Sequence, residues 1–304
     1  MARAWLLMCI ASLISFNTLS VKIHLDGTQK QVLLKKIELI SAVIYALSLI
    51  VLIKSNLDLY SVGLASSISS MSTVCMFIAI GYKDKIKQAI SNFKFKNFKN
   101  TFREVFPLFK RTIFVWVSGY IFWNSFNIIS LRVMGVVYTG QIGLTISLFR
   151  AGLNVSLSIV IGQMTAYAKL ISSGSEEIAR KSFVKYLAIS SLILVSGYSL
   201  FTILYHMSYL GEFGSKLLPI GELKYITIFF LFTFIATALN NYVRCFKIEP
   251  FVTLSAFNAF ATSLAFYYSL LYSSSGFTYV VLVSLVVCCW SFYIFVDKIK
   301  GSNE

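Results

Sequence analysis

Residues 135–164 read GVVYTGQIGLTISLFRAGLNVSLSIVIGQM, an apolar run with a single charged residue, Arg150, near its middle. A helix over Tyr138 to Met164 is long enough to cross a bilayer, because about twenty apolar residues span ~30 Å of hydrocarbon. Arg150 then lies roughly 18 to 21 Å of helix rise from either end. A cation at that depth is costly and normally faces protein, water or a ligand. The run therefore predicts a membrane helix with an arginine that requires an explanation.

The composition of the whole chain is that of a membrane protein. Hydrophobic residues make up 57% of the 304 residues and charged residues 13%, and the mean hydropathy is +0.77. We expect an all-α polytopic membrane protein with about nine transmembrane helices, at residues 4–21, 37–53, 57–82, 112–131, 138–164, 186–207, 225–243, 250–272 and 277–296. The first run also fits a signal peptide, but no A-x-A-like cleavage site follows it, so a first membrane helix is favoured.

The net charge of +15 comes from 27 Lys and Arg residues against 12 Asp and Glu. Most of the basic residues fall in alternate loops and in the C-terminal tail, as the positive-inside rule requires. The charge therefore indicates topology, with a cytoplasmic C-terminus, and does not indicate a nucleic-acid partner. The longest basic segment, Lys83 to Arg111, fits either a cytoplasmic linker or a stretch that holds anionic headgroups of membrane lipids. It divides the chain into residues 1–100, with three helices, and residues 101–304, with six.

Nothing in the sequence indicates metal, redox or nucleotide chemistry. The five cysteines form no CxxC pair, and His24 and His206 are isolated from other candidate ligands. No GxxxxGK[ST] phosphate loop is present. We therefore expect no catalytic residues, no metal and no cofactor, and a protein that is not an enzyme.

The expected helix at 112–131 carries aromatic and polar residues on one face. Trp116, Tyr120, Trp123 and Asn127 follow one another at steps of 4, 3 and 4, with Asn124 alongside. Aromatic faces stack on sugar rings and amides bond to hydroxyls, but the same face would also suit packing between helices. Both interpretations remain open.

The helix that contains Arg150 has a polar stripe of its own. Ser147, Arg150, Asn154 and Ser158 are spaced by 3, 4 and 4 residues and share one face. One hypothesis is that this face lines a lumen, in which Arg150 attracts anionic groups such as pyrophosphate or acidic sugars. Alternatively, Arg150 is structural and donates to backbone carbonyls or amides of neighbouring helices. The general behaviour of intramembrane charges favours the functional interpretation.

Several short segments resemble O-antigen flippases, the Wzx-type polysaccharide transporters. The resemblance lies in VYTGQIGL at 137–144, GQM at 162–164 and KLISSGSEE at 169–177. The earlier LDGTQK at 25–30, just before a membrane helix, is similar to that family's loop between its fourth and fifth helices. The motifs are loose, and their order and topology agree along nearly the whole chain.

The resemblance implies twelve helices in two six-helix lobes, with the present helices corresponding to the fourth through the twelfth. It therefore implies half of an N-terminal lobe, a complete C-terminal lobe and an absence of the first three helices. The implied activity is alternating-access transport of an oligosaccharide linked to undecaprenyl pyrophosphate across the bacterial inner membrane. Implied partners are this carrier lipid, the O-antigen polymerase and the chain-length regulator. An anionic cargo of this kind requires cationic or N–H partners on its path.

A multidrug or cation exporter of the same superfamily is the nearest alternative. Such pumps generally need a protonatable carboxylate within the membrane. The candidate acids, however, are expected at helix ends or in loops: Glu38, Asp58, Glu104 and Glu249. This arrangement disfavours a cation exporter.

An O-antigen polymerase or ligase is the enzymatic alternative. Enzymes of this kind have a large periplasmic loop with catalytic residues, whereas the longest outside link expected here is Ser208 to Lys224. Glu212 and Glu222 in that link have no His between them, which makes a weak acid–base pair.

Overall fold

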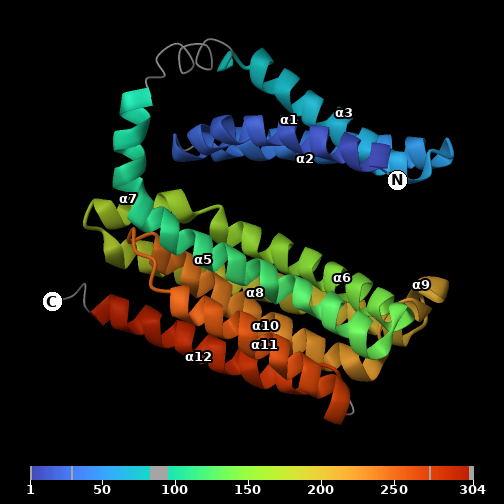
Figure 1. Cartoon of the computed structure of the whole chain (residues 1–304). Helices are drawn as coiled ribbons and strands as arrows, with labels where there is room; N and C mark the ends of the chain where they lie inside the picture. Colours follow the sequence, from blue (N-terminus) through green and yellow to red (C-terminus); the bar gives the residue numbers. More distant parts are fainter. Residues whose placement is uncertain (1, 29, 83–94, 274, 301–304) are drawn as a thin grey trace. The chain divides into compact units, whose positions relative to one another are not determined.

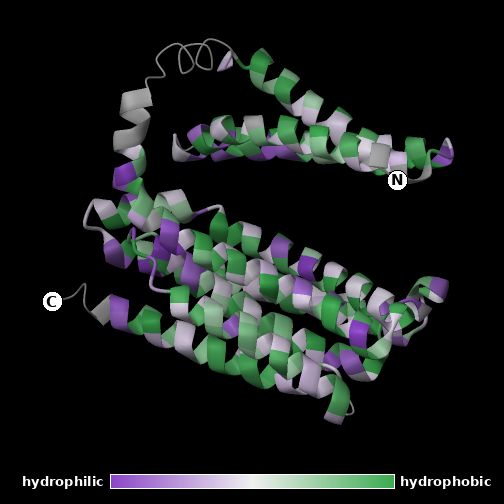
Figure 2. Ribbon diagram, viewed as in Figure 1, coloured by the Kyte–Doolittle hydropathy of each residue, from purple (hydrophilic) through white to green (hydrophobic). Residues whose placement is uncertain are grey.

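The computed structural model describes residues 2–28, 30–82, 95–273 and 275–300, and all regular secondary structure in these ranges is helical (Figure 1). Within these ranges, nine helices are long and apolar enough to cross a membrane. Figure 2 shows hydrophobic residues along the middles of the helices and hydrophilic residues gathered near many of their ends. The chain is an all-α polytopic membrane protein, as expected from its composition.

The chain forms two compact units, Met1–Phe102 and Arg103–Glu304. The first contains α1 (Ala2–Gly27), α2 (Gln31–Lys54) and α3 (Asp58–Ala79). The second contains most of α5 and all the later helices: α5 (Phe95–Met134), α6 (Val136–Ile161), α7 (Met164–Ser172), α8 (Glu176–His206), α9 (Gly211–Ser215), α10 (Ile220–Arg244), α11 (Val252–Tyr272) and α12 (Thr278–Lys300). Three of the nine candidate spans belong to the first unit and six to the second.

Several helices extend beyond the ranges expected from hydropathy. The hydropathy pattern predicts helices at 4–21 and 37–53, but α1 continues to Gly27 and α2 begins at Gln31. The polar segment 83–111 is helical from Phe95 onward, while residues 83–94 lie outside the described residues. Hydropathy delimits the part of a helix that lies in hydrocarbon, whereas backbone hydrogen bonding continues into the polar turns beyond it.

Hydroxyl groups hold the first unit together between its helices. Ser41 on α2 and Thr73 on α3 form a buried hydrogen bond of 2.8 Å between their hydroxyl oxygens. Ser69 donates to the backbone carbonyl of Ser41 at 2.9 Å, and Ser15 on α1 is 2.7 Å from Ser70 on α3. Small hydroxyl residues allow this close packing in a membrane protein, where burial of apolar surface gives little drive for helix association.

The core of the second unit is built from aromatic rings. Phe126 on α5 meets Phe266 on α11 at a centroid distance of 5.0 Å, and Phe229 and Phe230 of α10 are both fully buried. Ring pairs of this kind stabilise one relative orientation of the two rings, in addition to the stabilisation from burying apolar area. They fix α5, α10 and α11 against one another, and these helices form much of the wall of a pocket.

A second close contact positions α6 against α8. The hydroxyl of Tyr198 on α8 donates to the backbone carbonyl of Phe149 on α6 at 2.7 Å. The Tyr198 ring lies over Gly152, where a Cβ atom would come within 2.9 Å of the ring. Gly152 is therefore required for this approach, which sets the position of the neighbouring Arg150 on α6.

Candidate functional site

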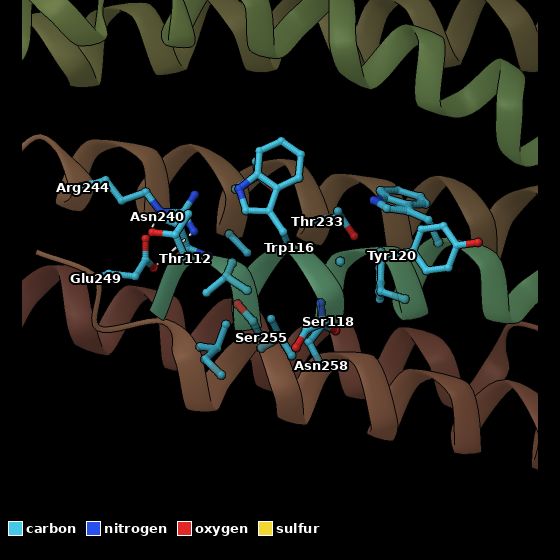
Figure 3. A pocket seen from close by; sticks show the side chains of 18 of the residues that line it. Thr112, Trp116, Ser118, Tyr120, Thr233, Asn240, Arg244, Glu249, Ser255 and Asn258 are labelled. Atoms are coloured by element: carbon cyan, nitrogen blue, oxygen red, sulfur yellow. Dashed lines mark hydrogen bonds and ion pairs between the residues drawn. The ribbon is translucent and has the colours of Figure 1, made fainter. Parts of the chain in front are cut away.

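A pocket of about 830 Å³ lies entirely within the second unit (Figure 3). Its walls come from α5, α10, α11 and α12, from the connection between α10 and α11, and from Arg150 of α6. Along α5 the lining extends from Thr112 to Asn124, which corresponds to about 18 Å of helix rise. This volume is within the range of pockets that take small-molecule ligands.

The α5 wall of the pocket is aromatic. Trp116, Tyr120 and Trp123 all line it, and the first two are 76% and 71% exposed. Asn124 also lines the pocket and donates from Nδ2 to the backbone carbonyl of Tyr120 at 2.8 Å. These four residues belong to the face that the sequence singled out.

Arg150 lines the pocket with an exposed side chain. Its guanidinium carbon lies 4.4 Å from the centroid of the Trp123 ring. In the part of the chain that the structure describes, Arg150 makes no hydrogen bond to a neighbouring carbonyl or amide and no ion pair. A guanidinium stacked on a ring keeps its N–H edge available for an acceptor, because stacking uses the face of the group.

The other end of the pocket contains an ion pair between Arg244 and Glu249. The Nε and Nη2 groups of Arg244 donate to the two carboxylate oxygens of Glu249, at 2.8 and 3.3 Å. Only 7% of the Glu249 side chain is exposed, against 31% for Arg244. Figure 3 shows this pair beside Asn240 and Thr112, with Trp116 between it and Tyr120. Lys247, which also lines the pocket, has a left-handed backbone with a φ of 61°.

Uncharged polar groups line the pocket between its two ends. Asn240, Ser255 and Asn258 are among them. The Oδ1 atom of Asn240 is buried and accepts no hydrogen bond from any described residue. A buried acceptor without a donor is costly, so this amide is suited to bond a donor of a ligand, in whichever orientation the amide is placed.

The charge of the pocket is positive. Three cationic residues line it, Arg150, Arg244 and Lys247, against one carboxylate, Glu249, among the residues that the structure describes. The expectation for Glu249 was a position at a helix end, and it does lie in the connection between α10 and α11. Its side chain is nevertheless nearly buried at the pocket, a placement that the chain order alone did not indicate.

The remaining residues proposed for a substrate path lie outside the pocket lining. They are all exposed: Asn127, Ser147, Asn154 and Ser158. Their role remains a prediction. The Oδ1 atom of Asn127 lies 3.2 Å from where a Cβ atom on Gly143 would be, so α5 and α6 approach closely at that level. Ser158 donates to the carbonyl of Val155 in its own helix at 2.6 Å.

No site for a metal ion is found in the described part of the chain. No group of three His, Cys, Asp or Glu side chains there is placed to hold an ion. The pocket instead offers cations, amides, hydroxyls and aromatic faces, which are groups that bind ligands through non-covalent contacts.

No family model matches this sequence, and no curated protein matches it. Two solved structures are similar in fold. One is a crystal structure of MATE in complex with MaD3S, with a TM-score of 0.64 and 14% identity over 87% of this chain. The other is a crystal structure of MATE in the straight conformation, with a TM-score of 0.65 and 13% identity over 99% of this chain.

This chain spans 62% of the length of the first structure and 78% of the second. The likeness shows that the fold of the chain resembles that of the two MATE structures. At 14% and 13% identity it shows the fold and no more.

Proposed function

We propose that this chain acts in a membrane exporter that moves an anionic, carbohydrate-bearing lipid by alternating access. The observation that carries the proposal is the position of Arg150, which stacks on Trp123 at the aromatic wall of a positively charged pocket. The cargo that fits this chemistry is an oligosaccharide linked to undecaprenyl pyrophosphate, as in O-antigen flippases. The fold shared with MATE transporters supports transport over catalysis.

The lining of the pocket suits both parts of such a cargo. Trp116 and Tyr120 expose large ring surfaces on which sugar rings can stack, and Asn240 and Asn258 offer amides to sugar hydroxyls. The cationic residues at the two ends suit phosphate or acidic sugars, because an anion that leaves water requires charged or N–H partners.

The proposal includes a topology and a location. The basic residues of alternate loops favour a C-terminus on the cytoplasmic side of a bacterial inner membrane. The Arg244 end of the pocket then lies on the cytoplasmic side, because α10 ends there. A lipid-linked sugar made in the cytoplasm would meet this end first, and the O-antigen polymerase with its chain-length regulator would receive the cargo on the other side.

Complementation of a strain that lacks its O-antigen flippase tests the proposal, with surface polysaccharide as the readout. We expect Arg150→Ala to abolish the polysaccharide and Arg150→Lys to retain part of it, since lysine keeps the charge but not the fork of N–H donors. Arg132→Ala, which removes an exposed arginine at the end of α5 outside the pocket, is the matched control. Normal polysaccharide in both Arg150 variants at normal expression would refute the proposal.

A second candidate function, export of organic cations, has one specific observation in its favour. Glu249 is a nearly buried carboxylate at the pocket, in a fold shared with MATE transporters. Efflux of ethidium from cells that express the chain separates the two functions. Cation export predicts efflux that Glu249→Gln abolishes, whereas the lipid exporter predicts no ethidium efflux in either form.

A further inference from the structure

We infer that Arg244 and Lys247 form a phosphate-binding subsite, and that the carboxylate of Glu249 occupies the phosphate position until a ligand replaces it. The inference rests on the proposed function and deepens it, because it assigns the charged headgroup of the cargo to one end of the pocket. It concerns the Arg244 end and is independent of the role of Arg150.

The geometry of the ion pair is that of an arginine bound to an oxyanion. Both carboxylate oxygens of Glu249 accept from separate N–H groups of Arg244, at 2.8 and 3.3 Å. Two oxygens of a phosphate match the same two donors, since carboxylate and phosphate share this paired arrangement. Glu249 therefore holds the guanidinium in the orientation that a phosphate requires.

The surroundings of the pair favour an anion over a neutral group. Lys247 lines the pocket three residues after Arg244, and no described acidic side chain pairs with it. The first turn of α11 begins at Val252, three residues after Glu249, and Leu254 and Ser255 of this turn line the pocket. Unsatisfied N–H groups at the start of a helix favour negative charge nearby. With one internal carboxylate against two cations, this end of the pocket retains positive charge.

The backbone at Lys247 shows how the subsite is held in place. Its φ of 61° lies in the left-handed region, which a residue with a Cβ atom adopts only at an energetic cost. The chain reverses here after the N–H of Lys247 donates to the carbonyl of Arg244 at 3.0 Å. This reversal brings Lys247 and Glu249 to the same end of the pocket as Arg244.

The two cationic ends lie too far apart to bind a single phosphate. Thr112 lies near the Arg244 end (Figure 3), and the guanidinium of Arg150 lies over the Trp123 ring. Thr112 and Trp123 are both on α5, about 16 Å apart along the helix axis. The aromatic wall lies between them. A ligand that binds its phosphate at Arg244 would place its sugar rings on Trp116 and Tyr120, toward Arg150.

Binding of inorganic pyrophosphate and of farnesyl pyrophosphate to the purified full chain in detergent tests the inference, with isothermal titration calorimetry as the readout. Glu249→Gln removes the internal competitor, so we expect pyrophosphate to bind about tenfold tighter than in the wild type. The double variant Arg244→Gln/Glu249→Gln leaves no unpaired buried charge and is expected to lose this gain. We expect the wild type and the two variants to rank in the same order of affinity for farnesyl pyrophosphate as for pyrophosphate. A higher affinity for farnesyl pyrophosphate than for pyrophosphate would identify the ligand as a lipid-borne phosphate and not free phosphate.

Lys247→Asn isolates the charge of Lys247 from its backbone conformation, because asparagine tolerates a left-handed φ. We expect pyrophosphate to bind several-fold more weakly to this variant, with an unchanged unfolding temperature. Lys169→Asn, an exposed lysine of α7 outside the pocket, is the control and should bind as the wild type does.

Unchanged or weaker pyrophosphate binding in Glu249→Gln would overturn the inference, as would the absence of binding in both that variant and the wild type. Wild-type affinity in Lys247→Asn would overturn it as well. These failures are separable from failure of the proposed function. If Glu249→Gln binds no tighter while Arg150→Ala still abolishes surface polysaccharide, the subsite is refuted and the exporter proposal stands.

Discussion

The guanidinium of Arg150 on α6 lies on the ring of Trp123 on α5, with its carbon 4.4 Å from the ring centroid. The ring also packs against Phe122, at a centroid distance of 4.8 Å, and against Phe230 of α10, at 5.9 Å. The cation is therefore placed by the aromatic core of the unit, although its side chain is exposed.

This contact predicts a measurable coupling between the two side chains. In a double-mutant cycle of Arg150→Met and Trp123→Leu, we expect a coupling of about 0.5–1 kcal/mol in the free energy of unfolding, the range for exposed cation–π pairs. Equilibrium unfolding in mixed micelles measures it. Trp123→Phe should retain part of the coupling because it keeps a ring. Strictly additive effects of the two substitutions would contradict the contact.

The approach of α8 to Gly152 predicts a severe effect of one added methyl group. We expect Gly152→Ala to destabilise the fold by about 1–3 kcal/mol, because the new Cβ would meet the ring of Tyr198 at 2.9 Å. The ring cannot easily move away, since its hydroxyl is bonded to Phe149 at 2.7 Å. Thermal unfolding measures the effect.

Gly140→Ala is the control for this substitution, because a Cβ at that α6 position meets nothing within 4 Å. It should leave stability unchanged or raise it by about 0.5–1 kcal/mol, as alanine does in place of glycine within a helix. Equal effects of the two substitutions would show that packing at Tyr198 does not decide the outcome.

The hydroxyl pair of Ser41 and Thr73 predicts a small but specific contribution to the first unit. We expect a coupling of about 0.6 kcal/mol in a cycle of Ser41→Ala and Thr73→Val, the average for hydrogen bonds between membrane helices. Ser66→Ala is the control, because the Ser66 hydroxyl donates only to the carbonyl of Val62 in its own helix, at 2.8 Å. A coupling of zero would show that the hydrogen bond between the two helices does not contribute to stability.

Cys245, just beyond the end of α10, provides a prediction of pH dependence. Burial raises the pKa of its thiol to about 11, because the thiolate loses its hydration. In a chain with Cys245 as its sole cysteine, we expect maleimide labelling at pH 8 to be at least a hundredfold slower than labelling of an exposed thiol, whose pKa is about 8.5. The rate should rise about tenfold per pH unit up to pH 11.

Ser173→Cys in a chain without other cysteines provides the exposed reference, since Ser173 lies in the turn after α7. Its labelling rate should level off above pH 9 while that of Cys245 continues to rise. If both thiols level off together, burial does not control the reactivity of Cys245.

The membrane spans were predictable because each satisfies a local physical requirement. A run of about twenty apolar residues must form a helix in hydrocarbon, where no water bonds the backbone. The aromatic face of α5 was predictable for a similar reason, since Trp116, Tyr120 and Trp123 are placed by the helical period alone. All three line the pocket.

The other end of the pocket was not predictable from such local patterns. Arg244, Lys247 and Glu249 lie at a helix end and in a short connection, where charged residues are ordinary. They reach the pocket through the packing of α10 and α11 against α5, which depends on contacts between distant rings such as Phe126 and Phe266. The sequence contains no periodic signal for that packing.

The polar stripe on α6 shows that helical spacing predicts which residues share a face but does not predict which of them reach the pocket. Arg150 reaches the pocket, whereas Ser147 and Asn154 on the same face do not line it. Arginine extends several bonds farther from the helix than serine or asparagine. Side-chain length, as well as helical period, therefore decides which residues of one stripe contact the pocket.

Every residue that lines the pocket, from Thr112 to Val287, belongs to the unit Arg103–Glu304. Under the exporter proposal, the contacts that a ligand makes with these residues stay the same whichever side of the membrane that unit is open to. Equal affinity in two states does not shift the equilibrium between them. The direction of net transport would then be set by a source of free energy outside the pocket, such as consumption of the cargo on the side where it is released.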